Sequence, residues 1–143
     1  MIQSAGVAIV DLNLQDPTVE PTILCVRAYS NWDFPKGHIE EDDTDRKATA
    51  ARELAEETGI SDIEFIEDFE FRTAYDFRHK GKRIDKQVFW YIAETETMAV
   101  KISHEHQEHL WLEWESAMMQ LTHHESKGVL TAAHAHMKSI GKA

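Results

Sequence analysis

The stretch over residues 37–60 constrains the chain more than any other part of it. It begins with an acidic loop and continues into residues 45–58, where alanine and leucine predominate and predict a helix. Within this helix Glu53, Glu56 and Glu57 are separated by three and four positions. That spacing places three carboxylates on one face of a single helical turn.

The three carboxylates destabilise the helix unless a cation is bound. Like charges at these spacings cost about 0.2–0.5 kcal/mol per pair in an isolated helix. Acids in the last turn before the stop residue Gly59 also oppose the helix dipole, by roughly 0.3–1 kcal/mol each. A divalent cation reverses the sign of these terms, and hard oxygen ligands suit Mg²⁺ or Mn²⁺. The spacing alone leaves a second interpretation open, a solvated acidic face in a chain with 26 acidic residues.

The overall composition predicts one domain over residues 1–143 with an ordinary core, since 42% of the residues are hydrophobic. Cys25 lies in an apolar run and is expected to be a buried side chain. No basic leader precedes an apolar segment and no run is long enough to span a membrane, so we expect a cytoplasmic protein. The formal net charge of −11 argues against broad contact with nucleic acid or anionic lipid.

Four C-terminal histidines are expected on helix surfaces: His123, His124, His134 and His136.

Apolar and β-branched runs separated by turn residues predict the remaining elements. We expect strands over 4–12, 22–28, 60–66, 69–77, 84–93 and 110–112, a short strand around Ile102, and helices over 45–58, 115–121 and 126–139. Residues 29–37 are predicted to form a loop, and residues 78–83 a hairpin connection around Gly81. Strands and helices mix without regular βαβ alternation, so the predicted class is α+β with a mixed sheet between helices.

Residues 52–60, together with Gly37, resemble the Nudix box of the Nudix hydrolases. That box is a glycine, five residues, a glutamate, seven residues and then Arg-Glu-apolar-x-Glu-Glu-x-Gly-apolar. Its second half is matched without a break, whereas the first half carries one extra residue. Counted forward from Gly37 the box glutamate falls on Asp43, and counted back from the arginine it falls on Thr44. We therefore expect residues 38–44 to form an irregular acidic surface loop.

The resemblance extends over most of residues 30–114. Residues 32–40 (WDFPKGHIE), 86–91 (KQVFWY) and 103–107 (SHEHQ) are similar to one branch of the family, the asymmetrical bis(5'-nucleosyl)-tetraphosphatases, which hydrolyse diadenosine tetraphosphate. The resemblance implies an α/β/α sandwich in which a mixed sheet lies between helices and the box forms a loop-helix-loop.

The resemblance also implies a set of catalytic and metal-binding residues: Glu53, Glu56, Glu57, Arg52, Gly37 and Glu105. The glutamates of the helix are expected to bind Mg²⁺, or else Mn²⁺. Arg52 is expected to hold a glutamate carboxylate by a bidentate contact, and the carbonyl of Gly37 is a further candidate ligand. Glu105 is the candidate distant carboxylate, as metal ligand or general base, with Glu108 as the alternative. A plain loop acid is the competing interpretation of both.

Five residues are candidates for contact with the substrate: Lys36, His38, Lys86, Tyr75 and Lys82. The basic cluster within residues 78–86 suits the distal phosphates of a long polyphosphate, but equally suits a hairpin whose charges prevent edge pairing. Tyr75 or Phe77 is expected either to stack on a nucleobase or to belong to the core.

The resemblance implies Mg²⁺-dependent hydrolysis of a pyrophosphate link in a nucleoside diphosphate joined to another group, with diadenosine tetraphosphate giving ATP and AMP as the leading expectation. Removal of pyrophosphate from the 5' end of RNA and hydrolysis of nucleoside triphosphates are the alternatives. A Nudix-fold binding module without catalysis is the alternative of another class. We expect a small nucleotide as the partner, with no membrane, no protein partner implied, and no nucleic acid except an RNA 5' end.

Overall fold

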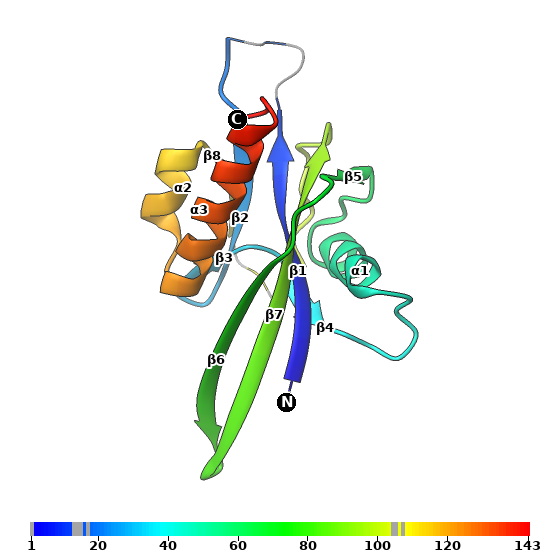
Figure 1. Cartoon of the computed structure of the whole chain (residues 1–143), viewed down its shortest axis with the longest axis vertical. Helices are drawn as coiled ribbons and strands as arrows, with labels where there is room; N and C mark the ends of the chain where they lie inside the picture. Colours follow the sequence, from blue (N-terminus) through cyan, green and yellow to red (C-terminus); the bar gives the residue numbers. More distant parts are fainter. Residues whose placement is uncertain (1, 13–15, 17, 104–105, 107) are drawn as a thin grey trace.

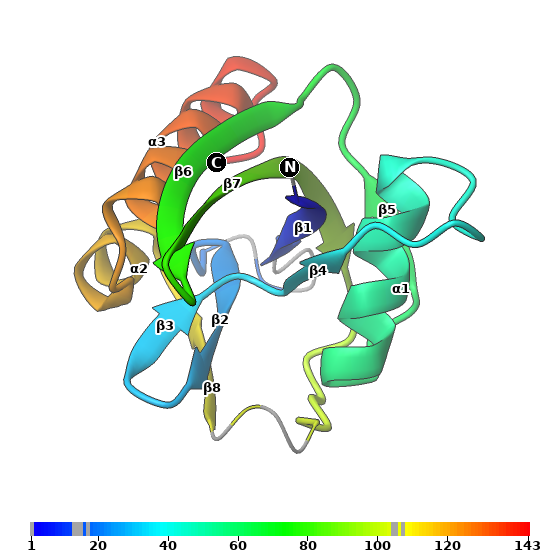
Figure 2. The same ribbon diagram turned by 90° about the horizontal axis from the view of Figure 1, so that it is seen from below.

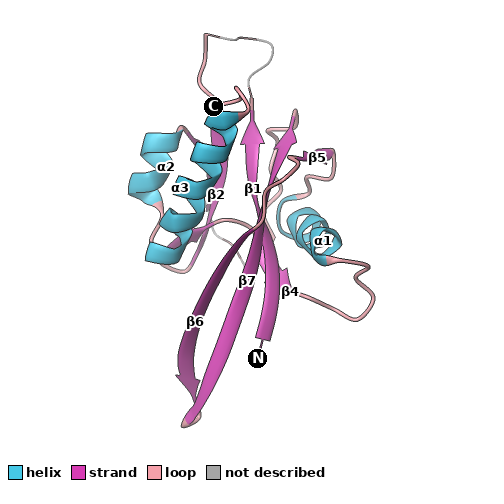
Figure 3. Cartoon of the chain, viewed as in Figure 1, coloured by secondary structure: helices cyan, strands magenta, loops and turns pink. Residues whose placement is uncertain are grey.

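The chain forms a mixed sheet whose central strand is β1. The computed structural model describes residues 2–12, 16, 18–103, 106 and 108–143. In chain order the elements are β1 (Ile2–Asp11), β2 (Thr22–Ala28), β3 (Asn31–Asp33), β4 (Lys36–His38), α1 (Arg46–Thr58), β5 (Ile63–Phe65), β6 (Phe71–His79), β7 (Lys82–Thr95), β8 (Glu108–Leu112), α2 (Trp114–Gln120) and α3 (His124–Ser139). Within the described residues the strands form one eight-stranded sheet. β1 and β7 run parallel and the other pairs are antiparallel, which confirms the predicted mixed sheet (Figures 1 and 3).

Two hydrophobic cores lie on the two faces of this sheet. One core packs Trp90 of β7 against α2 and α3, and the other packs Phe89 of β7 against Leu54 of α1. β1 contributes alternate side chains to both, since Ala8 and Val10 belong to the first core and Val7 and Ile9 to the second. A strand covered on both faces has apolar residues at successive positions rather than at alternate ones, as the sequence of β1 does. The helices therefore cover opposite faces, as the predicted sandwich requires (Figure 1).

The sheet divides between β1 and β2. The two strands pair only at Val10 with Ile23 and at Asp11 with Thr22. Further along, β4 takes the edge of β1, whereas β3 and β8 pair with β2, so that the two groups of strands diverge (Figure 2). Gly6 permits the approach of β4, because a Cβ there would lie 2.7 Å from the Cβ of Lys36 and 2.5 Å from the ring of Trp90.

The sequence predicted most elements, although β5 is shorter than the strand expected over 60–66 and the connection expected over 78–83 is reduced to residues 80–81. The region 29–37, expected to be a loop, contains β3 and β4, three residues each, and Ile102 lies in irregular chain rather than in a strand. Three-residue strands carry too few residues for an alternating pattern to be recognised. Gly59 ends α1 in the left-handed conformation at φ 77°, as predicted. Among the described residues, no helix is both long enough and apolar enough to cross a membrane.

β6 and β7 extend beyond the rest of the sheet as a two-stranded hairpin (Figures 1 and 3). Its turn is formed by Lys80 and Gly81, which both adopt positive φ, at 51° and 78°. Two positive φ values in a two-residue connection are typical of a type I′ turn, whose twist matches that of the flanking strands. The first register pair between β1 and β7 joins Ile2 to Lys86. The hairpin beyond Lys86 is therefore a ribbon of two strands.

Candidate functional site

The acidic face predicted on the helix lies at the C-terminal end of α1. Asp45 caps the N-terminus by accepting a hydrogen bond from the backbone N–H of Ala48 at 2.8 Å. Ala50 and Leu54 are buried against the sheet, which orients the helix about its axis.

Gly37 contacts the first of the three glutamates. A Cβ built on Gly37 would lie 1.9 Å from the Cδ of Glu53 and 2.2 Å from its Oε2. The carboxylate of Glu53 therefore occupies the space that any other residue at position 37 would fill. This contact is the physical reason for a glycine at this position.

Arg52 gathers the acidic side chains around one guanidinium group. Its Nη1 donates to Glu53 at 3.0 Å and to Glu56 at 3.2 Å. Its Nε and Nη2 donate to the two oxygens of Asp43, at 3.0 and 3.1 Å. The bidentate carboxylate predicted for Arg52 is thus Asp43, which belongs to the loop and not to the helix.

Asp43 corrects the expectation that the loop is only an acidic surface. Its side chain is 7% exposed, and it also accepts hydrogen bonds from the N–H of Glu40 and the hydroxyl of Thr49. The hydrogen bond from Arg52, followed by those from Glu40 and Thr49, holds the pKa of Asp43 well below its usual range. Of the two positions that the extra residue left open for the first acid of the box, Asp43 is the one in contact with Arg52.

The three helix glutamates differ in their surroundings. The side chain of Glu53 is 15% exposed, and burial raises its pKa although the hydrogen bond from Arg52 opposes the shift. Glu57 is buried, whereas Glu56 is 58% exposed. Carboxylates withdrawn from water are stabilised by a nearby cation. The donor chemistry and the close contact of Gly37 with Glu53 therefore fit a divalent ion, although the described part of the chain contains no ready-made cluster of three metal-binding side chains.

A cavity of about 630 Å³ lies where the sheet divides, beside the end of α1. Its lining includes Asp33, Lys36, Glu57, His106 and His123. A cation and a carboxylate therefore border the same space. That combination suits an anionic ligand bound together with a metal ion.

Lys36 is held in this cavity by Asp33. Its Nζ lies 3.0 Å from Oδ2 of Asp33 and 5.8 Å from the centre of the Trp90 ring. Burial opposes the charged form of Lys36, but Asp33 and, to a smaller extent, Tyr75 and Glu57 favour it. The net effect raises the pKa of Lys36 above its usual value, so the group stays charged. The other oxygen of Asp33 accepts a hydrogen bond from the hydroxyl of Ser126 at 2.7 Å. The first turn of α3 thus takes part in orienting Lys36.

The other predicted substrate contacts, Tyr75, Lys86, His38 and Lys82, are not among the lining residues of the cavity. Tyr75 is partly buried on β6, and the Nζ of Lys86 lies 6.0 Å from the centre of its ring. His38 is exposed and its carbonyl accepts a hydrogen bond from Arg52 at 3.0 Å. Lys82 lies at the far end of the hairpin, at the first residue of β7.

The predicted distant carboxylate, Glu105, lies outside the described residues. Its alternative, Glu108, is 56% exposed and forms an ion pair with Arg27 at 2.7 Å on β8. His106 lines the cavity. Of the described residues between Ser103 and Glu108, His106 therefore borders the cavity, whereas Glu108 pairs with Arg27 and is not among the lining residues.

Three polar residues that line the cavity were not predicted as site residues: Asp33, His106 and His123. Asp33 precedes Pro35-Lys36-Gly37 and carried no signal beyond that nearness. His123 was assigned to a helix surface, but it is the N-cap residue of α3 and borders the cavity. His134 also differs from the expectation, since its ring stacks on Trp114 with centroids 4.4 Å apart. Both assignments depend on how α3 packs, which periodicity alone does not define.

Cys25 is fully buried on β2, as expected.

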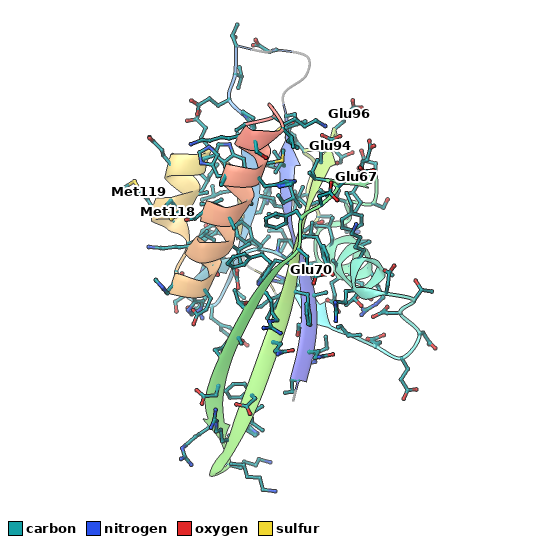
Figure 4. All side chains as sticks on the ribbon, in the orientation of Figure 1. Glu67, Glu70, Glu94, Glu96, Met118 and Met119 are labelled. Carbon is teal, nitrogen blue, oxygen red and sulfur yellow. The ribbon has the colours of Figure 1, made fainter. Side chains whose placement is uncertain are left out.

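A second cavity of about 720 Å³ lies at the opposite end of the sheet and is larger. Among the described residues its charged lining is entirely acidic and includes Asp11, Asp62, Glu94 and Glu96. Figure 4 labels the last two, at the end of β7. Without a basic side chain in its lining this cavity repels a phosphate group. The smaller cavity beside α1 is therefore the better candidate site.

Comparisons with family models, with curated proteins and with solved structures give results that agree with one another. The NUDIX domain family matches residues 3–133. The asymmetrical bis(5'-nucleosyl)-tetraphosphatase of Mus musculus is 35% identical over 108 residues, covering 73% of this chain and 70% of that protein. An RNA pyrophosphohydrolase of Caulobacter vibrioides is 39% identical over 69 residues, covering 42% of this chain and 40% of that protein. A crystal structure of a C. elegans Ap4A hydrolase binary complex superposes with a TM-score of 0.81 at 27% identity and covers 97% of this chain and 99% of that one.

Proposed function

The chain belongs to the NUDIX domain family and is a Nudix hydrolase, and from that premise we propose that it hydrolyses diadenosine tetraphosphate or a similar dinucleoside tetraphosphate to a nucleoside triphosphate and a nucleoside monophosphate. The observation that carries the proposal is the cavity in which Lys36, held by Asp33, lies near Glu57. The identity to a tetraphosphatase over 73% of this chain supports the same substrate.

We propose that Glu53, Glu56 and Glu57 hold Mg²⁺, with Mn²⁺ as a substitute and the carbonyl of Gly37 as a further ligand. Nudix hydrolases generally use divalent metal ions, and a bound Mg²⁺ neutralises phosphate charge and lowers the pKa of a water molecule. The partial burial of Glu53 and Glu57 supports this assignment, because a cation offsets the cost of placing carboxylates away from water. Arg52 then positions Glu53 and Glu56 through its hydrogen bonds to both carboxylates.

In this proposal Lys36 binds a phosphate oxygen in the cavity, and His38 and Lys86 contribute further charge. The aromatic ring of Tyr75 stacks on a nucleobase near the cavity, and Lys82 meets more distant phosphates. Glu105 accepts a proton from the attacking water molecule. The oxygen of that water forms a bond to phosphorus while the bond from phosphorus to the bridging oxygen breaks. Replacing Glu105 with glutamine should lower kcat at least about tenfold at neutral pH, and an unchanged kcat would assign that role to another group.

A substrate panel with Mg²⁺ tests the proposed substrate. The panel contains diadenosine tetraphosphate, nucleoside triphosphates and a 5'-triphosphorylated RNA, each incubated in oxygen-18 water. We expect diadenosine tetraphosphate to be cleaved with the highest kcat/KM, and the label in one product to identify the attacked phosphorus. Glu57→Gln should lose most of the turnover, whereas Glu41→Gln, an exposed loop acid, should keep it. Preferred cleavage of the triphosphorylated RNA or of a nucleoside triphosphate would overturn the assignment.

We also propose that residues 1–143 act as one domain. The family match over residues 3–133 and the single sheet support this organisation.

A further inference from the structure

The β6–β7 hairpin continues past the body of the molecule, and we call residues 75–86 the arm. The pair of Tyr75 and Lys86 is its base, and the turn at Lys80 and Gly81 is its tip. At about 3.3 Å per residue, the five pairs of the arm extend roughly 16 Å. Figure 1 shows the arm projecting beyond the ends of α2 and α3. Such a ribbon buries little apolar surface of its own, so its side chains are available to a ligand.

The two faces of the arm differ in chemistry. Residues directly opposite in an antiparallel pair point to the same face, and successive pairs alternate between faces. One face, which we call the aromatic face, carries the pairs Tyr75 with Lys86, Phe77 with Ile84, and His79 with Lys82. The other face carries Asp76 with Asp85 and Arg78 with Arg83. The aromatic face therefore contains two lysines, one histidine and no acid, in a chain with a formal net charge of −11.

The acidic side chains of the arm are neutralised on the other face. Arg83 lies 2.8 Å from Asp76 and 3.1 Å from Asp85. Charges that served only to prevent edge pairing would not need to be sorted in this way, with both acids and their partner on one side. The sorting leaves a positive potential on the aromatic face.

The aromatic face leads into the cavity beside α1. Thr73, two residues before the arm, points to the same face and accepts a hydrogen bond from Nε1 of Trp90 at 3.0 Å. The ring of Trp90 lies 5.8 Å from the Nζ of Lys36, which lines the cavity. Tyr75 packs against the same core at the base of the arm. The phosphate-binding lysine proposed above thus lies next to Trp90, whose core also contacts Tyr75 at the base of the arm.

The side chains of this face suit a nucleotide. Phe77 is 41% exposed, and its ring centroid lies 6.3 Å from that of Tyr75. The Nζ of Lys86 lies 6.0 Å from the Tyr75 centroid. Aromatic rings interleaved with cations bind nucleotides by stacking on the base and attracting the phosphate.

We propose that the aromatic face of the arm binds the nucleotide unit that continues from the phosphates held in the cavity, with its base on Phe77 and its phosphate at Lys82. The inference rests on the proposed function, since it extends the same site to the far part of the substrate. That unit is the second nucleoside phosphate of a dinucleoside polyphosphate, or the next nucleotide of a single-stranded RNA. Both offer a base attached to an anionic chain.

Equilibrium binding in Mg²⁺-free buffer with EDTA tests the arm without turnover. The ligands are diadenosine tetraphosphate, a 5'-triphosphorylated RNA tetramer, and adenosine 5'-tetraphosphate, which keeps the four phosphates but lacks the second nucleoside. The variants are Phe77→Val, which keeps a strand-forming side chain without the ring, and Lys82→Gln. The matched control is Arg78→Gln, which removes the same charge from the opposite face.

We expect Phe77→Val to raise the Kd at least about fivefold for one or both ligands that have a second unit, in line with base stacking on an aromatic ring. Lys82→Gln should raise the Kd for the same ligands, and Phe77→Trp should bind them as the wild type does. Phe77→Val should leave the Kd for adenosine 5'-tetraphosphate unchanged, because that ligand has no second base, and Arg78→Gln should leave the Kd of all three ligands unchanged. Which of the two ligands responds identifies the source of the unit.

The inference is overturned if Phe77→Val binds both two-unit ligands as the wild type does, or if Arg78→Gln weakens them as much as Lys82→Gln. An unchanged Tm for each variant shows that the fold is intact. The proposed function fails by a different result, the failure of the wild-type protein with Mg²⁺ to cleave diadenosine tetraphosphate.

Discussion

At the scale of single residues, Gly37 determines where the carboxylate of Glu53 lies. An added Cβ would overlap the carboxyl group of Glu53 at 1.9 Å, so Gly37→Ala should displace that side chain. A misplacement of about 1 Å near a reacting centre can cost about 10²-fold in rate, and we expect a loss of that order in kcat with the fold retained. Steady-state kinetics and a Tm measurement test this expectation.

Gly128 provides the control for this substitution. It lies in α3 with no atom within 4 Å of a built Cβ. Alanine is favoured over glycine in a helix by about 1 kcal/mol, so Gly128→Ala should raise the Tm and leave kcat unchanged. Equal kcat in Gly37→Ala and the wild type would show that Glu53 does not need its present position.

Asp43 acts at the same scale through Arg52. The pKa of Asp43 is depressed in the folded state. Its contribution to stability is therefore fully present above the pKa of an unfolded aspartate, about 3.9, and is lost as the pH falls through the lower pKa of the folded state. Asp43→Asn should therefore lower the Tm at pH 7, and the difference from the wild type should shrink as the pH falls below about 3.9. Thermal unfolding at several pH values measures this difference.

The same substitution should weaken catalysis, because Asp43 holds the arginine that contacts Glu53 and Glu56. Partners of metal ligands typically change metal affinity or activity about 10- to 100-fold, and we expect about a tenfold rise in the Mg²⁺ concentration needed for half activity. Thr44→Ala, at the alternative box position, is the control. A Tm difference for Asp43→Asn that is independent of pH would contradict the ionic role of Asp43.

At the scale of elements, α3 helps to shape the cavity through Asp33. Ser126 in its first turn donates to Oδ1 of Asp33, and Oδ2 contacts Lys36. Asp33→Asn leaves a neutral partner for Lys36, and we expect the KM for diadenosine tetraphosphate to rise about tenfold with a smaller change in kcat, because a hydrogen bond to a charged group is worth about 1.5–3 kcal/mol.

A double variant separates this positioning role from a general loss of structure. If Asp33 acts through Lys36, Asp33→Asn should have little further effect on KM in a Lys36→Met background. Ser126→Ala should produce a smaller rise in KM than Asp33→Asn, since it removes only the link to α3. Full additivity of the two substitutions at positions 33 and 36 would place Asp33 outside the action of Lys36.

At the scale of the whole molecule, the distribution of charge predicts stabilisation by metal. The proposed ligands lie in a chain of formal net charge −11, and a ligand that binds only the folded state at about ten times its Kd stabilises it by about 1.4 kcal/mol. We expect Mg²⁺ at that level to raise the Tm by roughly 2–4 °C per kcal/mol. Differential scanning fluorimetry with and without EDTA measures this shift.

The variant Glu57→Gln should lose most of the shift, and Glu41→Gln should keep it because Glu41 is an exposed loop residue. A shift of the same size in both variants would indicate general screening of the net charge rather than binding at the end of α1.

Local features of this protein were predictable from sequence because they depend on the geometry of one element. The spacing of Glu53, Glu56 and Glu57 defines a helix face, and Gly59 provides the left-handed residue that ends it. The two-residue turn at Gly81 follows from the same kind of local rule. The sequence by itself thus determined the family, the class of fold and the acidic helix end.

Only the tertiary structure decided which distant groups meet. Asp33 and Ser126 are 93 positions apart, and their contact requires α3 to pack beside β3. Asp43 reaches Arg52 through the path of a loop that the spacing left ambiguous. The sorting of aromatic and acidic side chains on the arm depends on the register between β6 and β7, and a shift of one residue would mix the two faces. Contacts between elements arise from strand order, register and loop path, which residue spacing within one element does not specify.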